Sequence, residues 1–307
     1  MEDPEELAGT LFERPERNKN LERAQALRQR GQLVWQGSRQ AYVAELQALL
    51  EVCCPKDMSS FERWLFAENY VFYMHSSFWR QYAATCFSQW KTSVMNMSVN
   101  DCIAHWFSRG ESPDYMSIQE STHWILKILA NSNIDHVQFV LDCRAVLDRL
   151  LPKKNCLILQ GENNSGKTLI ANSLAHLMIS VGEVQCLDMS RNQFWGQSLY
   201  MTRVVLANEI SVTDQTAETL KNLCEGQPVM IPIKYQHDFR MERTPIIVTT
   251  NTPIFAFTIN RSQHERSLAV RSFHYMFRSM SSADWTGCLR PINPLVWNGL
   301  FKTYRDE

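Results

Sequence analysis

A glycine-rich loop between an apolar run and a helical pattern constrains the fold of this chain more than any other feature. Residues 157–177 read LILQGENNSGKTLIANSLAHL, in which Gly161, Gly166, Lys167 and Thr168 fit the pattern G-x-x-x-x-G-K-[ST]. The glycines let backbone N–H groups turn towards a phosphate, and the helix start adds partial positive charge. The lysine reaches the β- and γ-phosphates, and the threonine hydroxyl ligates Mg²⁺. The pattern predicts a site for ATP and Mg²⁺, against the alternative of an accidental glycine turn.

The chain beyond residue 152 alternates short apolar runs with helical or turn-rich stretches. The runs that suit buried strands are NCLILQ, EVQCLDM, RVVLANE and PIIVTTN. Alternation of this kind predicts an α/β fold with a parallel central sheet. We expect the loop after the first run to contact the nucleotide through Gly161, Glu162, Asn163, Asn164, Ser165, Gly166, Lys167 and Thr168.

Polar side chains close two of these strand candidates. RVVLANE ends in Asn208 and Glu209, where phosphate-loop enzymes carry a carboxylate that holds Mg²⁺ or orients the attacking water. PIIVTTN ends in Asn251, a side chain suited to sensing the γ-phosphate. We therefore expect Lys167, Glu209 and Asn251 to act in catalysis, with Thr168 and Glu209 as Mg²⁺ ligands; a surface glutamate that closes a strand is the alternative for Glu209.

A helical block precedes the glycine loop. Stretches such as LERAQALRQRGQLV and AYVAELQALLEV carry apolar residues at helical spacing, and residues 61–82 are crowded with aromatic residues. Aromatic crowding fits a helical core better than a base-stacking surface. Residues 109–117 contain Gly, Pro and polar residues and predict a loop, and residues 121–151 predict helices broken near Asn131.

Composition excludes several classes of protein. The chain is 45% hydrophobic, which is ample for a core, and its formal net charge of −1 gives no global basic field for nucleic acid. Its nine cysteines lack CxxC spacing, so we expect reduced thiols rather than zinc or disulfides. No apolar run approaches the ~20 residues of a membrane span, and the start MEDPEELAGT is acidic rather than a signal peptide. We expect a soluble intracellular protein without membrane partners.

The order of these motifs resembles the superfamily 3 helicases of small DNA viruses, and most closely the papillomavirus replication initiator helicase. The similar stretches are LPKKNCLILQGENNSGKTLIANSL, NQFWGQSLYMTRVVLANE, TLKNLCEGQPVMIPIK, TPIIVTTN, MNMSVNDCIAHW, IDHVQFV and INPLVWNGLFKTY. The resemblance spans about residues 95–304 and is weakest after residue 277. More distantly, the chain is similar to parvovirus and polyomavirus helicases.

This resemblance implies an AAA+-type P-loop ATPase of a small DNA virus, or of a viral element captured by a host, that unwinds DNA for replication in a host nucleus. It implies a helical region of unknown role (1–94), an all-α oligomerisation collar (95–151), an ATPase domain (152–277) and a C-terminal tail (278–307). The partners would be single-stranded or forked DNA and further copies of the chain, as a hexameric ring. Arg271 would be an arginine finger that reaches the γ-phosphate of the next subunit, with Lys153 and Lys221 serving the same site.

The resemblance also places DNA-binding residues in a central channel. Lys234 at a hairpin tip, Phe194 on a neighbouring loop, and Tyr235 and His237 would touch one DNA strand. An ammonium near phosphate and aromatic rings near bases suit sequence-independent binding. A solvated lysine and a core phenylalanine are the alternatives for Lys234 and Phe194.

Three departures from the family pattern affect these expectations. Asn208 stands where the family carries the first of two adjacent acids, so one carboxylate of the metal and water network is missing. Tyr235 follows Lys234 where the family has histidine. Residues 1–90 are too few for the family's origin-binding domain and resemble nothing in it that we identify, and no His-x-His nickase motif occurs. Origin recognition would then reside in a separate protein or be absent.

Two other functions remain open from the sequence. Asn208 and the short N-terminal region also suit a helicase-derived protein that binds nucleotide and oligomerises but hydrolyses poorly. A nucleotide kinase or other phosphotransferase is the third reading, although nothing resembles a lid or an acceptor-substrate pocket. ATP turnover separates the first two, and a product assay with nucleoside acceptors tests the third.

Overall fold

The computed structural model divides the chain into two compact units. One contains Met1–Asn96 and Phe107–Arg109, and the other contains Met97–Trp106 and Gly110–Glu307. The residues described are 15–31, 35–109, 113–184, 196–210, 212–233 and 237–304, without the side chains of residues 15–18 and 109.

The first unit is helical. Its elements are α2 (Pro15–Gln29), α3 (Arg39–Cys53), α4 (Met58–Ala67), the 3₁₀ helix η1 (Val71–Tyr73) and α5 (Trp79–Asn96). Side-chain oxygens cap two helix starts: the Ser38 hydroxyl accepts from Ala41 N, and Asp57 forms a reciprocal capping box with Ser60. The helices predicted from apolar spacing before residue 53 are confirmed as α2 and α3.

A buried carboxylate ties the elements of this unit together. Glu45 on α3 is fully buried and accepts hydrogen bonds from Trp35 Nε1 at 2.9 Å and Tyr73 Oη at 2.8 Å. Arg23 on α2 pairs with its other oxygen at 2.9 Å. A buried charge is tolerated only when it is paired and hydrogen-bonded, so this network fixes α2, α3 and η1 to one another.

Most of the aromatic residues between residues 61 and 82 form this core. Phe61, Phe72 and Tyr73 are fully or almost fully buried, and their rings contact neighbouring aromatic rings at centroid distances of 4.6–6.4 Å. The core interpretation is confirmed for these residues. Phe66 is the exception, because 73% of its surface is exposed.

The second unit is built on a parallel five-stranded sheet. Its strand order is β2-β3-β6-β1-β7, and every strand pairing is parallel. The strands are β1 (Cys156–Gly161), β2 (Val181–Val184), β3 (Val204–Asn208), β6 (Ile246–Thr250) and β7 (Ser272–Phe277). The predicted parallel α/β sheet is confirmed, and β6 separates β1 from β3.

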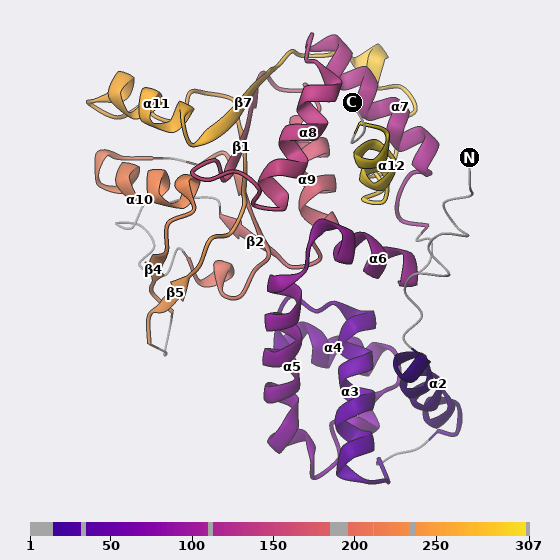
Figure 1. The fold of residues 1–307 in the computed structure, drawn as a ribbon. Coiled ribbons are helices and arrows are strands. Elements are labelled where there is room, and N and C mark those ends of the chain that lie inside the picture. The colour runs from indigo at the N-terminus through magenta and orange to yellow at the C-terminus, as the bar shows by residue number, and fades with distance from the viewer. Residues whose placement is uncertain are drawn as a thin grey trace. The chain divides into compact units, whose positions relative to one another are not determined.

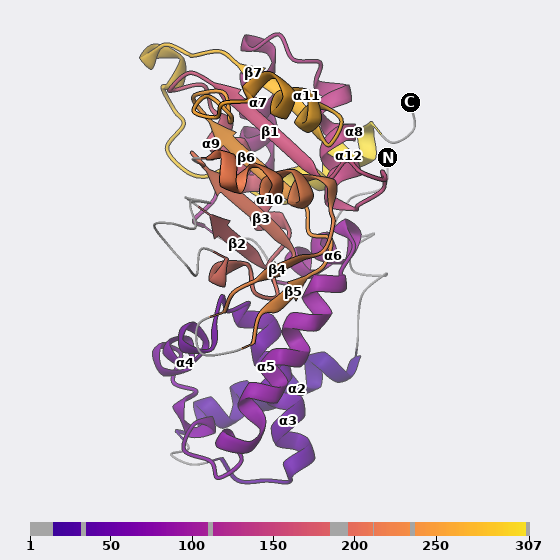
Figure 2. The ribbon, with the colours of Figure 1, turned by 90° about the vertical axis from the view of Figure 1, so that its left-hand side faces the viewer.

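Helices cover both faces of the sheet. Figure 1 shows α8 (His136–Leu147) and α9 (Lys167–Leu177) on one side and α10 (Asp214–Glu225) and α11 (Arg261–Ala269) on the other. In Figure 2, α10 and α11 lie in front of the strands. Covering both faces explains why β1, β3 and β6 are continuous apolar runs: a strand of a parallel sheet has no solvent face. Apolar side chains of α10 pack against β1, β3 and β6 in one buried cluster.

The remaining elements of this unit surround the sheet or extend from it. They are α6 (Val99–Arg109, which continues into the first unit), α7 (Ile118–Asn131), α12 (Val296–Thr303), the 3₁₀ helices η2 (Gln197–Leu199) and η3 (Ser282–Trp285), and an antiparallel pair β4 (Val229–Ile231) and β5 (Phe239–Met241). Since α8 contacts β1 and α12 contacts α7 and α8, helices expected in a collar and in a tail share one unit with the sheet.

The predicted strands are confirmed for three of the four runs, as β1, β3 and β6. The fourth strand, β2, begins earlier than predicted, at Val181, and residues 185–189 of that run lie outside the described part. β7 was not predicted. It is an edge strand whose burial alternates along SFHYMF, so its sequence lacks the apolar run of a central strand.

The predicted break between helices near Asn131 is confirmed, because α7 ends at Asn131 and α8 begins at His136. Residues 113–117 of the predicted loop form no helix or strand, and residues 110–112 lie outside the described part. Among the residues with assigned positions, no helix combines the length and apolarity that a membrane crossing requires. The cysteines at the positions described are free thiols.

Asn155 joins three elements at the start of β1. The residue is fully buried, and its Nδ2 donates to Leu223 O at 3.1 Å and Thr244 O at 2.7 Å. Its backbone N–H is shared between Cys224 O and Arg271 O, and its Oδ1 accepts from Arg243 Nε. One side chain therefore holds the end of α10 and the start of β6 against β1.

We expect Asn155→Ala to lower the free energy of unfolding of the protein by about 2–4 kcal/mol, because it leaves two buried carbonyls without donors. Chemical denaturation followed by circular dichroism measures this change. Asn222→Ala is the matched control, since Asn222 is exposed on α10, and it should change the same free energy by less than about 0.5 kcal/mol. Equal effects of the two variants would contradict this role of Asn155.

Candidate nucleotide-binding site

The predicted phosphate loop lies between the end of β1 and the start of α9. Gly166 precedes the helix with φ of +81°, and Asn164 also has positive φ, at +57°. α9 begins at Lys167 and its first turn presents backbone N–H groups that lack partners within the helix. The loop thus has the strand–turn–helix geometry that binds phosphate.

The two glycines of the motif meet different constraints. A Cβ on Gly161 would lie 2.1 Å from the backbone oxygen of Phe277 on β7, so the close approach of two strands excludes a side chain. At Gly166, a Cβ would lie 2.7 Å from Cδ1 of Ile128 on α7, in addition to the positive φ. The loop is therefore packed against β7 and α7.

Lys167 points into the site from the first turn of α9. Its side chain is buried, and Nζ donates to Glu162 O at 2.9 Å and to Asn251 Oδ1 at 2.6 Å. Burial lowers the pKa of Lys167, and the charge of Glu209 acts in the opposite direction. An ammonium held by neutral oxygens in this way is suited to accept the negative charge of a phosphate.

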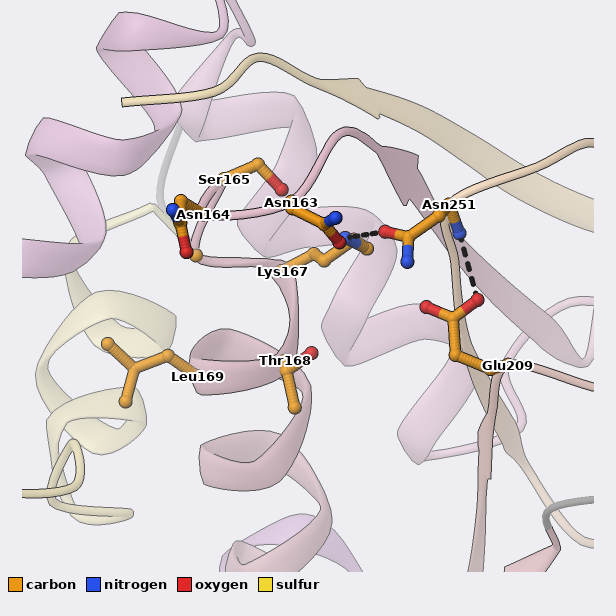
Figure 3. A pocket seen from close by; sticks show the side chains of 9 residues that line it. Asn163, Asn164, Ser165, Lys167, Thr168, Leu169, Glu209 and Asn251 are labelled. Atoms are coloured by element: carbon orange, nitrogen blue, oxygen red, sulfur yellow. Dashed lines mark hydrogen bonds between the residues drawn. The ribbon is translucent and has the colours of Figure 1, made fainter. Parts of the chain in front are cut away.

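The strand order brings Asn251 and Glu209 to the lysine. Because β6 lies between β1 and β3, the residue after β6 sits between the phosphate loop and the end of β3. Asn251 N donates to Glu209 Oε2 at 3.1 Å, and Figure 3 shows the side chains of Lys167, Asn251 and Glu209 pointing towards one another. Glu209 has positive φ, +48°, which is uncommon for a residue other than glycine.

These residues line a cavity of about 270 Å³, a size suited to part of a nucleotide. Its walls are formed by Asn163, Asn164, Ser165, Gly166, Lys167, Thr168, Leu169, Glu209 and Asn251. The buried Ser165 hydroxyl has no hydrogen-bond partner among the described atoms, which fits a site that is completed by a ligand. The Thr168 hydroxyl and the Glu209 carboxylate are the oxygen ligands that Mg²⁺ prefers. Gly161 and Glu162 lie next to this cavity without lining it.

Asn208 does not line the cavity. Its Oδ1 accepts from Thr249 Oγ1 on β6 at 2.8 Å, and the residue is absent from the cavity wall. The amide oxygen of Asn208 is therefore hydrogen-bonded to a side chain of the neighbouring strand.

Arg271 and Lys153 lie near the amino-terminal ends of the sheet strands, whereas the phosphate loop lies at their carboxyl-terminal ends. Arg271 directly precedes β7 and Lys153 precedes the first residue of β1 by three positions, whereas the loop follows the end of β1. The register pairs the first residues of β1 and β7 and likewise their last ones. The six residues of β1, at about 3.3 Å per residue, span roughly 16 Å. This distance exceeds the reach of an arginine side chain, so Arg271 is too far to serve the phosphate loop of its own chain.

Lys221 belongs to the same region as Arg271. It is buried on α10 and pairs with Glu218, one turn earlier on the helix. The end of α10 meets the start of β1, because Asn155 N donates to Cys224 O. The three residues expected to act on an adjacent subunit's nucleotide, Lys153, Lys221 and Arg271, are therefore remote from the cavity of their own chain.

Of the residues predicted to bind DNA, only His237 lies in the described part. It is exposed between β4 and β5, the antiparallel pair that extends from the sheet in Figure 1. Lys234, Tyr235 and Phe194 lie outside the described residues. Their roles stay predictions.

Three residues were missed by sequence reasoning, two beside the phosphate loop and one beside Arg271. Leu169 lines the cavity at the end opposite Glu209, as Figure 3 shows. Trp285 Nε1 donates to Asn164 O at 3.1 Å, and its ring stacks on Trp124 at 5.5 Å. Glu225 pairs with Arg271. Leu169 could have been predicted, because it directly follows the phosphate-loop motif. Trp285 and Glu225 could not, because they are distant in sequence from their partners.

Comparison with known proteins places this site in a family. A family profile described as papillomavirus helicase matches residues 67–305 of this chain. The chain belongs to the papillomavirus helicase family. This is a family of viral replication helicases that are driven by ATP. The resemblance therefore begins earlier than residue 95, and the expectation that residues 1–90 resemble nothing in the family is wrong for residues 67–90. That stretch contains η1 and most of α5. Its sequence shows the alternation of buried and exposed residues found in any amphipathic helix, and no short motif.

The individual relatives cover a part of their own length. Replication protein E1 of Mastomys natalensis papillomavirus is 26% identical over 244 residues, which is 71% of this chain and 38% of that protein. Replication protein E1 of human papillomavirus type 5b is 30% identical over 58% of this chain and 31% of its own length. Initiator protein NS1 of Junonia coenia densovirus is 28% identical over 47% of this chain and 27% of its own length. The chain thus spans about a third of the length of the curated relatives it matches.

A solved structure shares the fold. A crystal structure of the JCV helicase superposes with a TM-score of 0.61, covering 87% of each chain at 13% sequence identity. The α/β fold with a five-stranded parallel sheet after a helical region is therefore the fold of a viral helicase.

The contact between Trp285 and the phosphate loop gives a prediction. We expect Trp285→Phe to weaken ATP affinity about 2–10-fold, because phenylalanine keeps the stack on Trp124 but removes one of two donors to Asn164 O, the other being Met280 N. Titration with a fluorescent ATP analogue measures the affinity.

Trp106→Phe is the matched control, since Trp106 Nε1 also donates to backbone oxygens, at the far end of α9. It should leave ATP affinity unchanged. Loss of the same size in both variants would show that the effect is not specific to Asn164.

Proposed function

We propose that this chain is an ATP-dependent DNA helicase subunit that works as a ring of identical copies. The single observation that carries the proposal is the separation of two half-sites in one chain. Lys167, Asn251 and Glu209 surround the phosphate loop at one sheet edge, and Arg271 lies at the other edge. A complete ATPase site then forms only where two copies meet.

The half-site at the phosphate loop supplies binding and water activation. The loop N–H groups and Lys167 hold the β- and γ-phosphates, and Glu209 orients the attacking water. Asn251, bonded to both Lys167 and the Glu209 carboxylate through its own side chain and backbone, senses whether the γ-phosphate is present. Mg²⁺, held through Thr168 and Glu209, would neutralise phosphate charge. Arg271 from the next copy stabilises the charge that develops on the transferred phosphoryl group, with Lys153 and Lys221 beside it.

Movement of DNA is assigned to the hairpin between β4 and β5. Lys234, Tyr235, His237 and Phe194 would contact one strand of single-stranded or forked DNA in the channel. The antiparallel β4–β5 pair, which extends from the sheet, supports this assignment. We further propose a hexameric ring joined through residues 95–151 and action in a host nucleus.

The test is ATP turnover against protein concentration, with and without single-stranded DNA. We expect turnover per subunit to rise steeply with concentration and to increase with DNA. Arg271→Ala should lower turnover by roughly 10³-fold while ATP still binds, and Lys167→Ala should abolish binding. Arg266→Ala is the control, because Arg266 is exposed on the neighbouring α11. Turnover that is independent of concentration and unaffected by Arg271→Ala would refute the shared site.

The hydrogen bond between Asn208 and Thr249 favours a second function, a nucleotide-binding assembly protein that hydrolyses poorly. Asn208→Asp restores the first of the family's two adjacent acids. If the missing carboxylate limits hydrolysis, this variant should raise turnover about 10-fold, whereas Asn208→Ala should not. Wild-type turnover equal to that of Lys167→Ala would favour the second function over the motor.

A further inference from the structure

Arg271 is held in a fixed orientation by its own chain. Its Nε and Nη2 each lie 2.9 Å from Oε2 of Glu225, and its Nη1 donates to the backbone oxygen and hydroxyl of Ser267 at 2.6 and 3.1 Å. The side chains of Arg271 and Glu225 are 23% and 14% exposed, so this pair is shielded from solvent more than an ordinary surface pair.

These contacts leave a defined part of the guanidinium available. A guanidinium has five N–H donors, and Nε, Nη1 and one N–H of Nη2 are engaged by Glu225 and Ser267. The second N–H of Nη2 has no acceptor among the contacts of the described residues. Glu225 and Ser267 therefore fix the plane of the guanidinium and leave one N–H of Nη2 without an acceptor among the described residues.

The stability of α10 does not explain an acid at position 225. Glu225 is the last residue of α10, where the helix dipole disfavours negative charge. Gly226, with φ of +80°, already terminates the helix. The backbone also holds the Glu225 carboxylate near Arg271. Asn155 N donates to both Cys224 O and Arg271 O, so the end of α10 and the start of β7 are fixed beside each other.

We propose that Glu225 is a positioning residue for Arg271, which sets the direction in which the guanidinium meets the phosphates bound by the next copy. This inference rests on the proposed function, because it concerns the same shared site. Glu225 does not touch the nucleotide. It acts on the ATP site of the neighbouring copy and not on the site of its own chain.

Mixed assemblies test this directional role. Lys167→Ala subunits lack a working phosphate loop but carry Arg271, and Arg271→Ala subunits carry the loop but lack the arginine. Mixing the two should restore ATP turnover at the interfaces where an intact loop meets an intact arginine. Glu225→Gln, which keeps the shape and one acceptor oxygen, is then introduced into either parent.

The expected result depends on which parent carries the change. In the Lys167→Ala parent, which donates Arg271, Glu225→Gln should lower the restored turnover by about 10²-fold, as for a misplaced catalytic group. In the Arg271→Ala parent it should leave the restored turnover within about twofold. In otherwise wild-type protein, Glu225→Gln should lower kcat without changing KM for ATP, and Glu225→Asp should recover part of kcat.

Glu265→Gln is the matched control, because Glu265 pairs with Arg261 on α11 in the same unit but at an exposed position. It should have no effect in either parent. Equal losses from both placements of Glu225→Gln, or no loss from either, would overturn the role of Glu225 alone. Absence of turnover in the unmodified mixture would overturn the shared site and this inference together.

Discussion

The parallel pairing of β6 between β1 and β3 is the interaction on which the candidate site depends. It sets Asn251 next to both the phosphate loop and Glu209, so one asparagine bonds the lysine through its side chain and the carboxylate through its backbone. If β1 and β3 were direct neighbours, Asn251 would not lie between Lys167, at the start of α9, and Glu209, which follows β3. The sheet therefore brings together Lys167, Glu209 and Asn251, which are more than 40 positions apart in sequence.

The phosphate loop could be predicted because its contacts are local. Lys167 bonds to Glu162, five positions away, and the positive φ of Gly166 is a property of the loop itself. Glu209 and Asn251 were found by a slightly longer argument, since parallel strands end at the same edge of a sheet. β7 escaped prediction because an edge strand alternates between covered and open faces and so lacks a continuous apolar run.

Contacts between distant segments could not be predicted from the sequence. Glu225 and Arg271 are separated by 46 positions, and Trp285 reaches Asn164 across 121. No local pattern marks such partners, because an acid at the end of a helix or a tryptophan in a short 3₁₀ helix is common. The helical stretch from residue 67 to residue 90 shows the same limit from another side: it belongs to the family match, yet its amphipathic spacing is shared by countless unrelated helices.

The close approach of Gly161 to Phe277 means that the length of β7 also affects the geometry between copies of the chain. One end of this strand rests against the phosphate loop, and Arg271 stands immediately before its other end. In an assembly where Arg271 meets a neighbour's phosphates, the length of β7 would set the distance between the nucleotide at a chain's own phosphate loop and the nucleotide that its Arg271 contacts. Insertion or deletion of a residue within that strand would change the repeat distance of the whole assembly.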